Sequence, residues 1–223
     1  MFEFSYVAVA IHDKNSEMGG SAMFCFSHNF MGDLQTGVKM SKNSNSYSTI
    51  LDQNDLEDIV CADHITEKLR ELAPKAKSGE QPFFIAMGMK KPHLPWYFPD
   101  RYFDYYPENE VDLPYNPNSP TDLPDIAWHP FRMMHYDDCT PEAVGVDCIG
   151  EMNCTYPDWK IKEQRRAYYA AVTHSDNELG RVLDELKNLG LEDDTIISFW
   201  SDHGYTLGNI LLMLIIRQKR DQI

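Results

Sequence analysis

The 223-residue chain has little positive charge: 20 Lys and Arg residues stand against 35 Asp and Glu residues, a formal net charge of −15. Nucleic-acid binding requires a basic surface that neutralises phosphates, so the composition argues against such a partner. The same excess of negative charge repels other anions at long range. Any anion site in this protein therefore needs a local cluster of positive groups.

Long apolar segments are also missing. The apolar run Ile210–Ile216 is seven residues long, far below the roughly 20 that cross a bilayer. The first residues, Met1–Ser5, lack the positive charge with which a signal peptide begins. We therefore expect no membrane partner and find no readable signal peptide.

The five cysteines lack the C-x-x-C spacing of a zinc site; they are Cys25, Cys61, Cys139, Cys148 and Cys154. A disulfide such as Cys139–Cys148 would fit a secreted or lysosomal setting. Asn153–Thr155 matches the glycosylation sequon, a triplet that also arises by chance.

Periodicity predicts two helices and two strands. Apolar residues at helical spacing predict one helix from an N-cap at Asn54 to Pro74, and a second over Asp158–Leu189. The apolar runs Phe83–Met89 and Thr195–Ser201 are typical of buried strands in parallel sheets. Residues 18–25 and 41–48 are predicted to be loops. This order of elements favours an α/β fold.

Polar residues follow both predicted strands directly. Lys91 and His93 come after the first strand; Asp202 and His203 come after the second, before a turn at Gly204. Taken alone, each pair fits a solvated turn. In a parallel arrangement the carboxyl ends of the strands meet at one edge, so a carboxylate, two imidazoles and an ammonium group would gather there. Together the pairs predict an anion- and metal-binding edge.

A long segment rich in Pro, Tyr and Asp, residues 99–141, separates the first strand from the second helix. Long loops without regular structure are often functional. Its aromatic residues and those just before it could stack on a sugar ring or pack the loop onto the domain; they include Trp96, Tyr97, Tyr102 and Tyr105. The sequence leaves both interpretations open.

Four segments of the chain resemble the sulfatase family, in particular its iduronate-sulfatase branch: Pro82–Pro95, Tyr102–Pro107, Arg166–Leu183 and Thr195–Gly208. The resemblance covers residues 52–208. It divides the chain into a poorly matched segment (1–50), a partial sulfatase domain (51–208) and an unmatched tail (209–223).

The resemblance implies an alkaline-phosphatase-like α/β fold, with a partial parallel sheet flanked by helices. It also implies hydrolysis of sulfate esters on glycosaminoglycan sugars, in a lysosomal or secreted setting. Asp202 and His203 match positions that bind a calcium ion, and Lys91 and His93 match catalytic, sulfate-binding positions. The chemistry agrees, because calcium prefers carboxylate oxygens, a cation stabilises the charge on a transferring sulfate group, and a histidine can protonate the leaving alcohol.

The chain also departs from the family. No cysteine begins the Cys-x-Pro-Ser-Arg type of motif that carries the family's nucleophile: Cys25 precedes Phe-Ser-His, and Cys139 precedes Thr-Pro-Glu. The early paired aspartates of the calcium site and the Glu-His loop and lysine after Gly208 are missing too. We therefore expect a sulfatase fragment without turnover. Two alternatives are a non-catalytic fragment that binds a sulfated glycan, and a zinc-dependent phosphoesterase of the alkaline phosphatase superfamily.

Overall fold

The structure, a computed structural model, describes residues 5–11, 21–26, 46–50, 56–116, 122, 136–149, 151, 154–201, 204, 205 and 207. The chain divides into two compact units. Among the described residues, the first unit contains 5–11, 21–26, 56–91 and 173–201, and the second contains 46–50, those between 92 and 172, and 204, 205 and 207. Asp202 and His203 lie outside the described residues.

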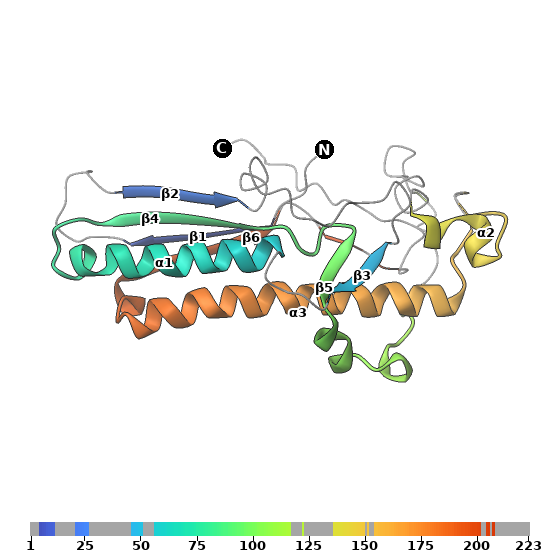
Figure 1. Ribbon diagram of the computed structural model, residues 1–223. Helices are drawn as coiled ribbons and strands as arrows, with labels where there is room; N and C mark the ends of the chain where they lie inside the picture. Colours follow the sequence, from blue (N-terminus) through green and yellow to red (C-terminus); the bar gives the residue numbers. More distant parts are fainter. Residues whose placement is uncertain are drawn as a thin grey trace. The chain divides into compact units, whose positions relative to one another are not determined.

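The first unit contains a four-stranded sheet in the order β2-β4-β1-β6 (Figure 1). Its strands are β1 (Ser5–Ile11), β2 (Ser21–Phe26), β4 (Phe83–Met89) and β6 (Thr195–Ser201). β2 and β4 form a parallel pair, while β1 runs antiparallel to both β4 and β6. β4 and β6 therefore point in the same direction, with β1 between them.

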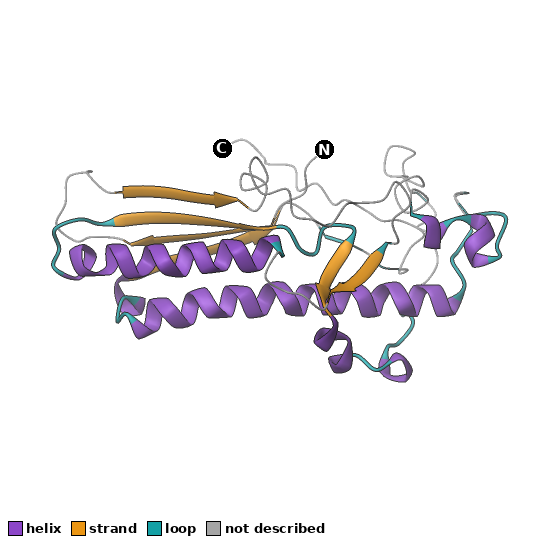
Figure 2. Ribbon diagram, viewed as in Figure 1, coloured by secondary structure: helices purple, strands orange, loops and turns teal. Residues whose placement is uncertain are grey.

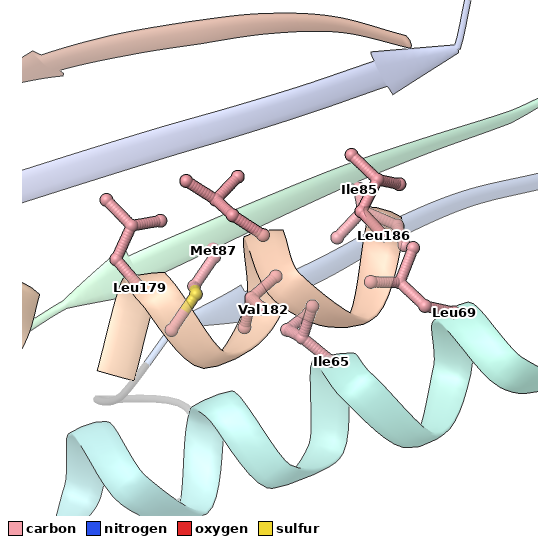
Figure 3. A pocket seen from close by; sticks show the side chains of 8 residues that line it. Ile65, Leu69, Ile85, Met87, Leu179, Val182 and Leu186 are labelled. Carbon is pink, nitrogen blue, oxygen red and sulfur yellow. The ribbon is translucent and has the colours of Figure 1, made fainter. Parts of the chain in front are cut away.

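The core of the first unit lies between β4 and the helices α1 (Glu57–Lys77) and α3 (Asp158–Asn188), whose final turns belong to this unit. Ile85 and Met87 of β4 are fully buried against Ile65 of α1 and Val182 of α3. These side chains point toward one another in Figure 3, and the space between them has no room for a water molecule. Close packing of this kind fixes β4 on the helices.

The predicted helices exist, with different ends. α1 begins at Glu57, with Leu56 in the N-cap position and no side-chain cap, so the predicted N-cap at Asn54 is wrong. Pro74 lies in the last turn and does not end α1, because its carbonyl still accepts a bond from the Ser78 amide at 3.2 Å. α3 ends just before Gly190, whose φ of 63° suits a glycine after a helix.

Both predicted strands have the predicted bounds, yet their burial differs. β4 is buried apart from alternate side chains such as Phe84, which is 36% exposed. β6 was expected to be buried as well, and that prediction is wrong: Ile196 is 60% exposed and Phe199 is 66% exposed. β6 lies at the edge of the sheet, and no side chain of β6 joins the buried clusters of the described residues.

The second unit is built around a parallel pair of short strands, β3 (Tyr47–Ile50) and β5 (Trp96–Pro99) (Figure 2). The described part of the segment expected to lack structure carries the short helices η2 (Asp100–Tyr105), η3 (Glu108–Glu110) and η6 (Asp137–Cys139), and α2 (Pro141–Val144) begins where the segment ends. The loop predicted at residues 41–48 includes the first two residues of β3, and the loop predicted at 18–25 contains most of β2.

Aromatic side chains form the core of the second unit. Trp96 is fully buried and meets the rings of Tyr168 and Tyr205 edge-on, with centroids 5.7 and 5.9 Å away. Tyr102 is also buried, whereas Tyr105 is 65% exposed. Trp96 and Tyr102 therefore pack the loop onto the unit, as one of the two interpretations predicted.

The disulfide joins Cys148 to Cys154, six positions apart, and Cys139 is a buried free thiol. The suggested Cys139–Cys148 bridge is therefore wrong. Within the described part of the chain, no helix combines the length and the apolarity that crossing a membrane requires.

Candidate functional site

The carboxyl ends of β4 and β6 are level with each other. Met89, the last residue of β4, pairs with Ser5 of β1, and Ser201, the last residue of β6, pairs with the same Ser5. With β1 between them, the two ends are separated by two strand spacings, about 10 Å. Lys90, the first residue after β4, therefore leaves the sheet level with the end of β6. Asp202 and His203, which follow β6 in the sequence, lie outside the described residues, so the gathering of the two pairs at one edge stays a prediction.

A buried carboxylate fixes the chain where it leaves β4. Asp58, in the first turn of α1, is 2% exposed, and its two oxygens accept the backbone amides of Lys90 at 2.6 Å and Lys91 at 3.0 Å. The Ser175 hydroxyl, on α3, donates to the Lys91 carbonyl at 3.0 Å and lies 3.5 Å from Asp58 Oδ2. Both the amide and the carbonyl of Lys91 are thus held by side chains.

The two lysines of this turn differ in environment. Lys90 forms an ion pair with Glu57 at 2.8 Å near the surface. The Lys91 residue is 6% exposed, and burial lowers the pKa of its ammonium to about 8, against the opposing attraction of the Asp58 carboxylate. Burial also raises the pKa of Asp58, although the amides of Lys90 and Lys91 oppose this shift. Lys91 is therefore a desolvated amine whose charge can change near neutral pH.

His93 belongs to the second unit and is half-buried. Its Nδ1 contacts the backbone carbonyl of Leu94, which can only accept a hydrogen bond, so Nδ1 is the donor in this contact. The turn around it is closed by Trp96, whose Nε1 donates to the Pro92 carbonyl at 2.7 Å. The buried Trp96 thereby anchors the segment that presents His93.

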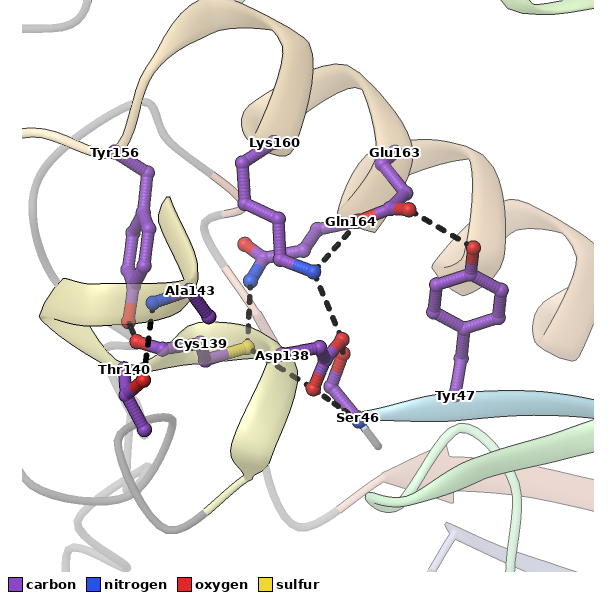
Figure 4. Close-up of polar contacts among 10 residues, drawn as sticks. All are labelled: Ser46, Tyr47, Asp138, Cys139, Thr140, Ala143, Tyr156, Lys160, Glu163 and Gln164. Atoms are coloured by element: carbon purple, nitrogen blue, oxygen red, sulfur yellow. Dashed lines mark hydrogen bonds and ion pairs between the residues drawn. The ribbon is translucent and has the colours of Figure 1, made fainter. Parts of the chain in front are cut away.

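A second polar cluster lies at the start of α3 (Figure 4). The buried Lys160 ammonium donates to Asp138 at 2.8 Å and to Glu163 at 2.6 Å. Asp138 also accepts the amide and the hydroxyl of Ser46 at 2.7 and 2.6 Å, and Tyr47 donates to Glu163 at 2.9 Å. Burial disfavours the charged form of Lys160, yet the hydrogen bonds with Asp138 and Glu163 raise its pKa. These polar side chains find their hydrogen-bond partners within the cluster, which joins β3 to η6 and α3.

A family model described as "Sulfatase" matches residues 5–220. The chain belongs to the sulfatase family. This confirms the resemblance seen in the sequence and, with it, the alkaline-phosphatase-like α/β fold.

The curated relatives are sulfatases and one broader phosphatase-superfamily enzyme. "Sulfatase" of Formosa agariphila is 37% identical over 59% of this chain and 24% of its own length. "Iduronate 2-sulfatase" of Homo sapiens is 32% identical over 64% of this chain and 25% of its own length. "Multifunctional alkaline phosphatase superfamily protein PehA" of Trinickia caryophylli is 32% identical over 60% of this chain and 26% of its own length. The matched part of this chain thus spans about a quarter of each relative.

Sulfatases generally use a calcium ion, and the structure can be tested for its ligands. Asp202 offers the hard oxygen that calcium prefers, whereas the nitrogen of His203 is an unusual calcium ligand. Both residues lie outside the described part of the chain. Among the described residues, no three His, Cys, Asp or Glu side chains come together as a metal site would require. The described residues therefore do not themselves form a calcium site.

Cys139 provides a direct check on the sulfatase nucleophile, because Cys139-Thr140-Pro141 matches the start of that motif. Cys139 is fully buried, and burial beside Asp138 raises the pKa of its thiol to about 12. Thr140 caps α2 by accepting the Ala143 amide at 3.2 Å. This segment is a buried helix start, and Glu142 and Ala143 stand where the nucleophile motif has Ser and Arg.

Sequence reasoning missed Asp58 and Ser175. The place of Asp58 in the first turn of α1 indicates only a favourable interaction with the helix dipole, and no pattern points to Ser175. The sequence offers one signal: Asp58 is a carboxylate at the start of the helix that directly precedes the strand before Lys91. The contact depends on how α1 and α3 pack against β4, which no local pattern encodes.

Proposed function

We propose that this chain carries part of a hydrolytic site for sulfate esters of glycosaminoglycan sugars. One observation supports this most strongly: β4 and β6 point the same way and end opposite the same residue, Ser5. The Lys91-Pro92-His93 segment and the Asp202-His203 pair therefore follow strands that end level with each other. The family membership supplies the reaction class.

In this proposal Lys91 binds the sulfate group. Its ammonium is desolvated, so its attraction for an anion is weakly screened by water. A positive group of this kind also stabilises the negative charge that develops on sulfate oxygens during S–O cleavage. The chain's net charge of −15 makes such a local cation necessary.

His93 is proposed to protonate the leaving alcohol. With Nδ1 held by the Leu94 carbonyl, Nε2 is the nitrogen that can take up a proton and then donate it. Asp202 and His203 are proposed as two ligands of a calcium ion, which needs further oxygen ligands. The actions of Lys91 and His93 are independent of that ion.

The substrate class is proposed from the relatives, which include enzymes named iduronate 2-sulfatase, arylsulfatase and endo-4-O-sulfatase. A lysosomal or secreted location accords with the Cys148–Cys154 disulfide, because disulfides persist in oxidising compartments. Glycosylation at Asn153, which lies outside the described residues, is part of the same proposal.

We further propose that these 223 residues, taken alone, bind a sulfate ester without hydrolysing it, since none of the five cysteines begins the nucleophile motif. Loss of a covalent nucleophile typically costs several orders of magnitude in rate. The test is hydrolysis of a fluorogenic aryl sulfate by the purified chain. Calcium is present, together with the enzyme that converts the nucleophile cysteine of sulfatases into formylglycine. Turnover clearly above the no-enzyme rate would contradict the proposal.

A phosphoesterase is the second candidate, and the similarity to PehA, named as an alkaline phosphatase superfamily protein, favours it. The two candidates differ in ligand charge. A sulfatase site binds inorganic sulfate at least as well as phosphate, whereas a phosphoesterase site with zinc prefers phosphate. Competition between the two anions, followed through the His93 ring signals in the presence of calcium or zinc, distinguishes them.

A further inference from the structure

We infer that Asp58 and Ser175 form a clamp that positions Lys91 for anion binding. This inference rests on the proposed role of Lys91. Asp58 accepts the amides of Lys90 and Lys91 with separate oxygens, and Ser175 donates to the carbonyl of Lys91. The backbone of Lys91 is thereby fixed on both sides of its Cα.

The clamp places the carboxylate of Asp58 in the protein interior. Asp58 is 2% exposed, and burial raises its pKa, so a carboxylate there is kept in an unfavourable environment. A helix start needs no buried acid, because Glu57 already complements the first turn of α1 at its surface. The geometry explains the buried acid: its oxygens fix the two amides that immediately follow β4.

Electrostatics and positioning predict opposite effects on anion affinity. A negative carboxylate close to Lys91 weakens the attraction of the ammonium for sulfate, so Asp58→Asn should tighten sulfate binding if only charge matters. If Asp58 holds Lys91 in place, the same substitution weakens binding, because an amide cannot accept both N–H groups as a carboxylate does. The sign of the change therefore separates the two effects.

The experiment is a titration of the full chain with inorganic sulfate, followed by NMR shifts of the His93 ring. We expect Asp58→Asn to raise the sulfate Kd about tenfold and Ser175→Ala to raise it a few-fold, whereas Ser175→Thr, which keeps the hydroxyl, retains native affinity. Asp63→Asn is the matched control: it removes the same charge from the same helix at a partly exposed position. It should leave Kd within about twofold.

Hydrogen exchange measures the clamp without any ligand. The amides of Lys90 and Lys91 should be protected in the native chain and should exchange at least tenfold faster in Asp58→Asn. Ser175→Ala leaves the Asp58 carboxylate and its bonds to the two amides in place, and it serves if Asp58→Asn fails to fold. Native sulfate affinity in Ser175→Ala, or tighter binding in folded Asp58→Asn, would overturn the clamp while leaving the proposed function standing. Absence of sulfate binding by the native chain, with the two amides protected, would overturn the proposed function and the positioning role together, and leave Asp58 a structural residue.

Discussion

β4 and β6 are alike in sequence and direction but opposite in environment. Each is a seven-residue apolar strand that ends opposite Ser5 and is followed by charged residues. β4 lies inside the sheet with α1 and α3 packed on it, while β6 is the edge strand and exposes Ile196, Ile197 and Phe199. An apolar run therefore predicts a strand reliably, but its burial depends on which elements the rest of the chain places beside it.

The largest expected contrast is in core stability. Ile85→Ala, in β4, should lower the free energy of unfolding by about 2–5 kcal/mol, because the side chain is fully buried and its removal leaves a cavity. Ile197→Ala, in β6, removes the same atoms from a side chain that is 44% exposed and should cost less than about 1 kcal/mol. Urea unfolding of both variants makes the comparison, and equal losses would show that β6 is buried in solution.

The end of β4 should also give a pH dependence. The pKa of Lys91 is lowered to about 8 in the folded chain, so between about pH 8 and 10.5 the unfolded lysine binds more protons than the folded one. Stability should therefore rise with pH through this window, by roughly 3 kcal/mol at most.

Lys91→Met removes this contribution, and Lys90→Met serves as the matched control on the neighbouring, paired lysine. The free energy of unfolding is measured against pH for the native chain and both variants, and the comparison separates the contribution of Lys91 from that of the groups the three proteins share. If the free energy of unfolding of Lys91→Met changes with pH in the same way as that of the native chain, Lys91 is solvated in the folded state.

The smallest effect is expected on the exposed face of β6. Phe199→Lys should change the free energy of unfolding by no more than about 0.5 kcal/mol, because the ring is 66% exposed. The comparable change in β4, Met87→Lys, should prevent folding, since it buries an unpaired charge. Circular dichroism shows whether each variant folds, and urea unfolding measures its stability. A large loss of stability in Phe199→Lys would show that another part of the protein covers β6.

Local patterns were sufficient for the strands Phe83–Met89 and Thr195–Ser201, for the body of α3, and for the position of Lys91 at a strand end. They failed for Asp58, which became a backbone acceptor through the packing of α1 on β4, because that contact depends on residues far apart in the sequence. They also failed for the disulfide, because spacing alone does not choose among the cysteines, and Cys148 pairs with Cys154 six positions away. Pro74 stayed inside α1 because a proline in the last turn removes only one hydrogen bond.

The most direct test is a sulfate titration of the native chain beside Lys91→Met and Lys90→Met, followed by the NMR signals of the His93 ring. The two variants lose the same charge from adjacent positions, one buried beside Asp58 and one paired at the surface with Glu57. We predict saturable shifts in the native chain and in Lys90→Met, and none in Lys91→Met. Equal affinity in the two variants, or no saturable binding by the native chain, would contradict the proposal that Lys91 binds the sulfate group.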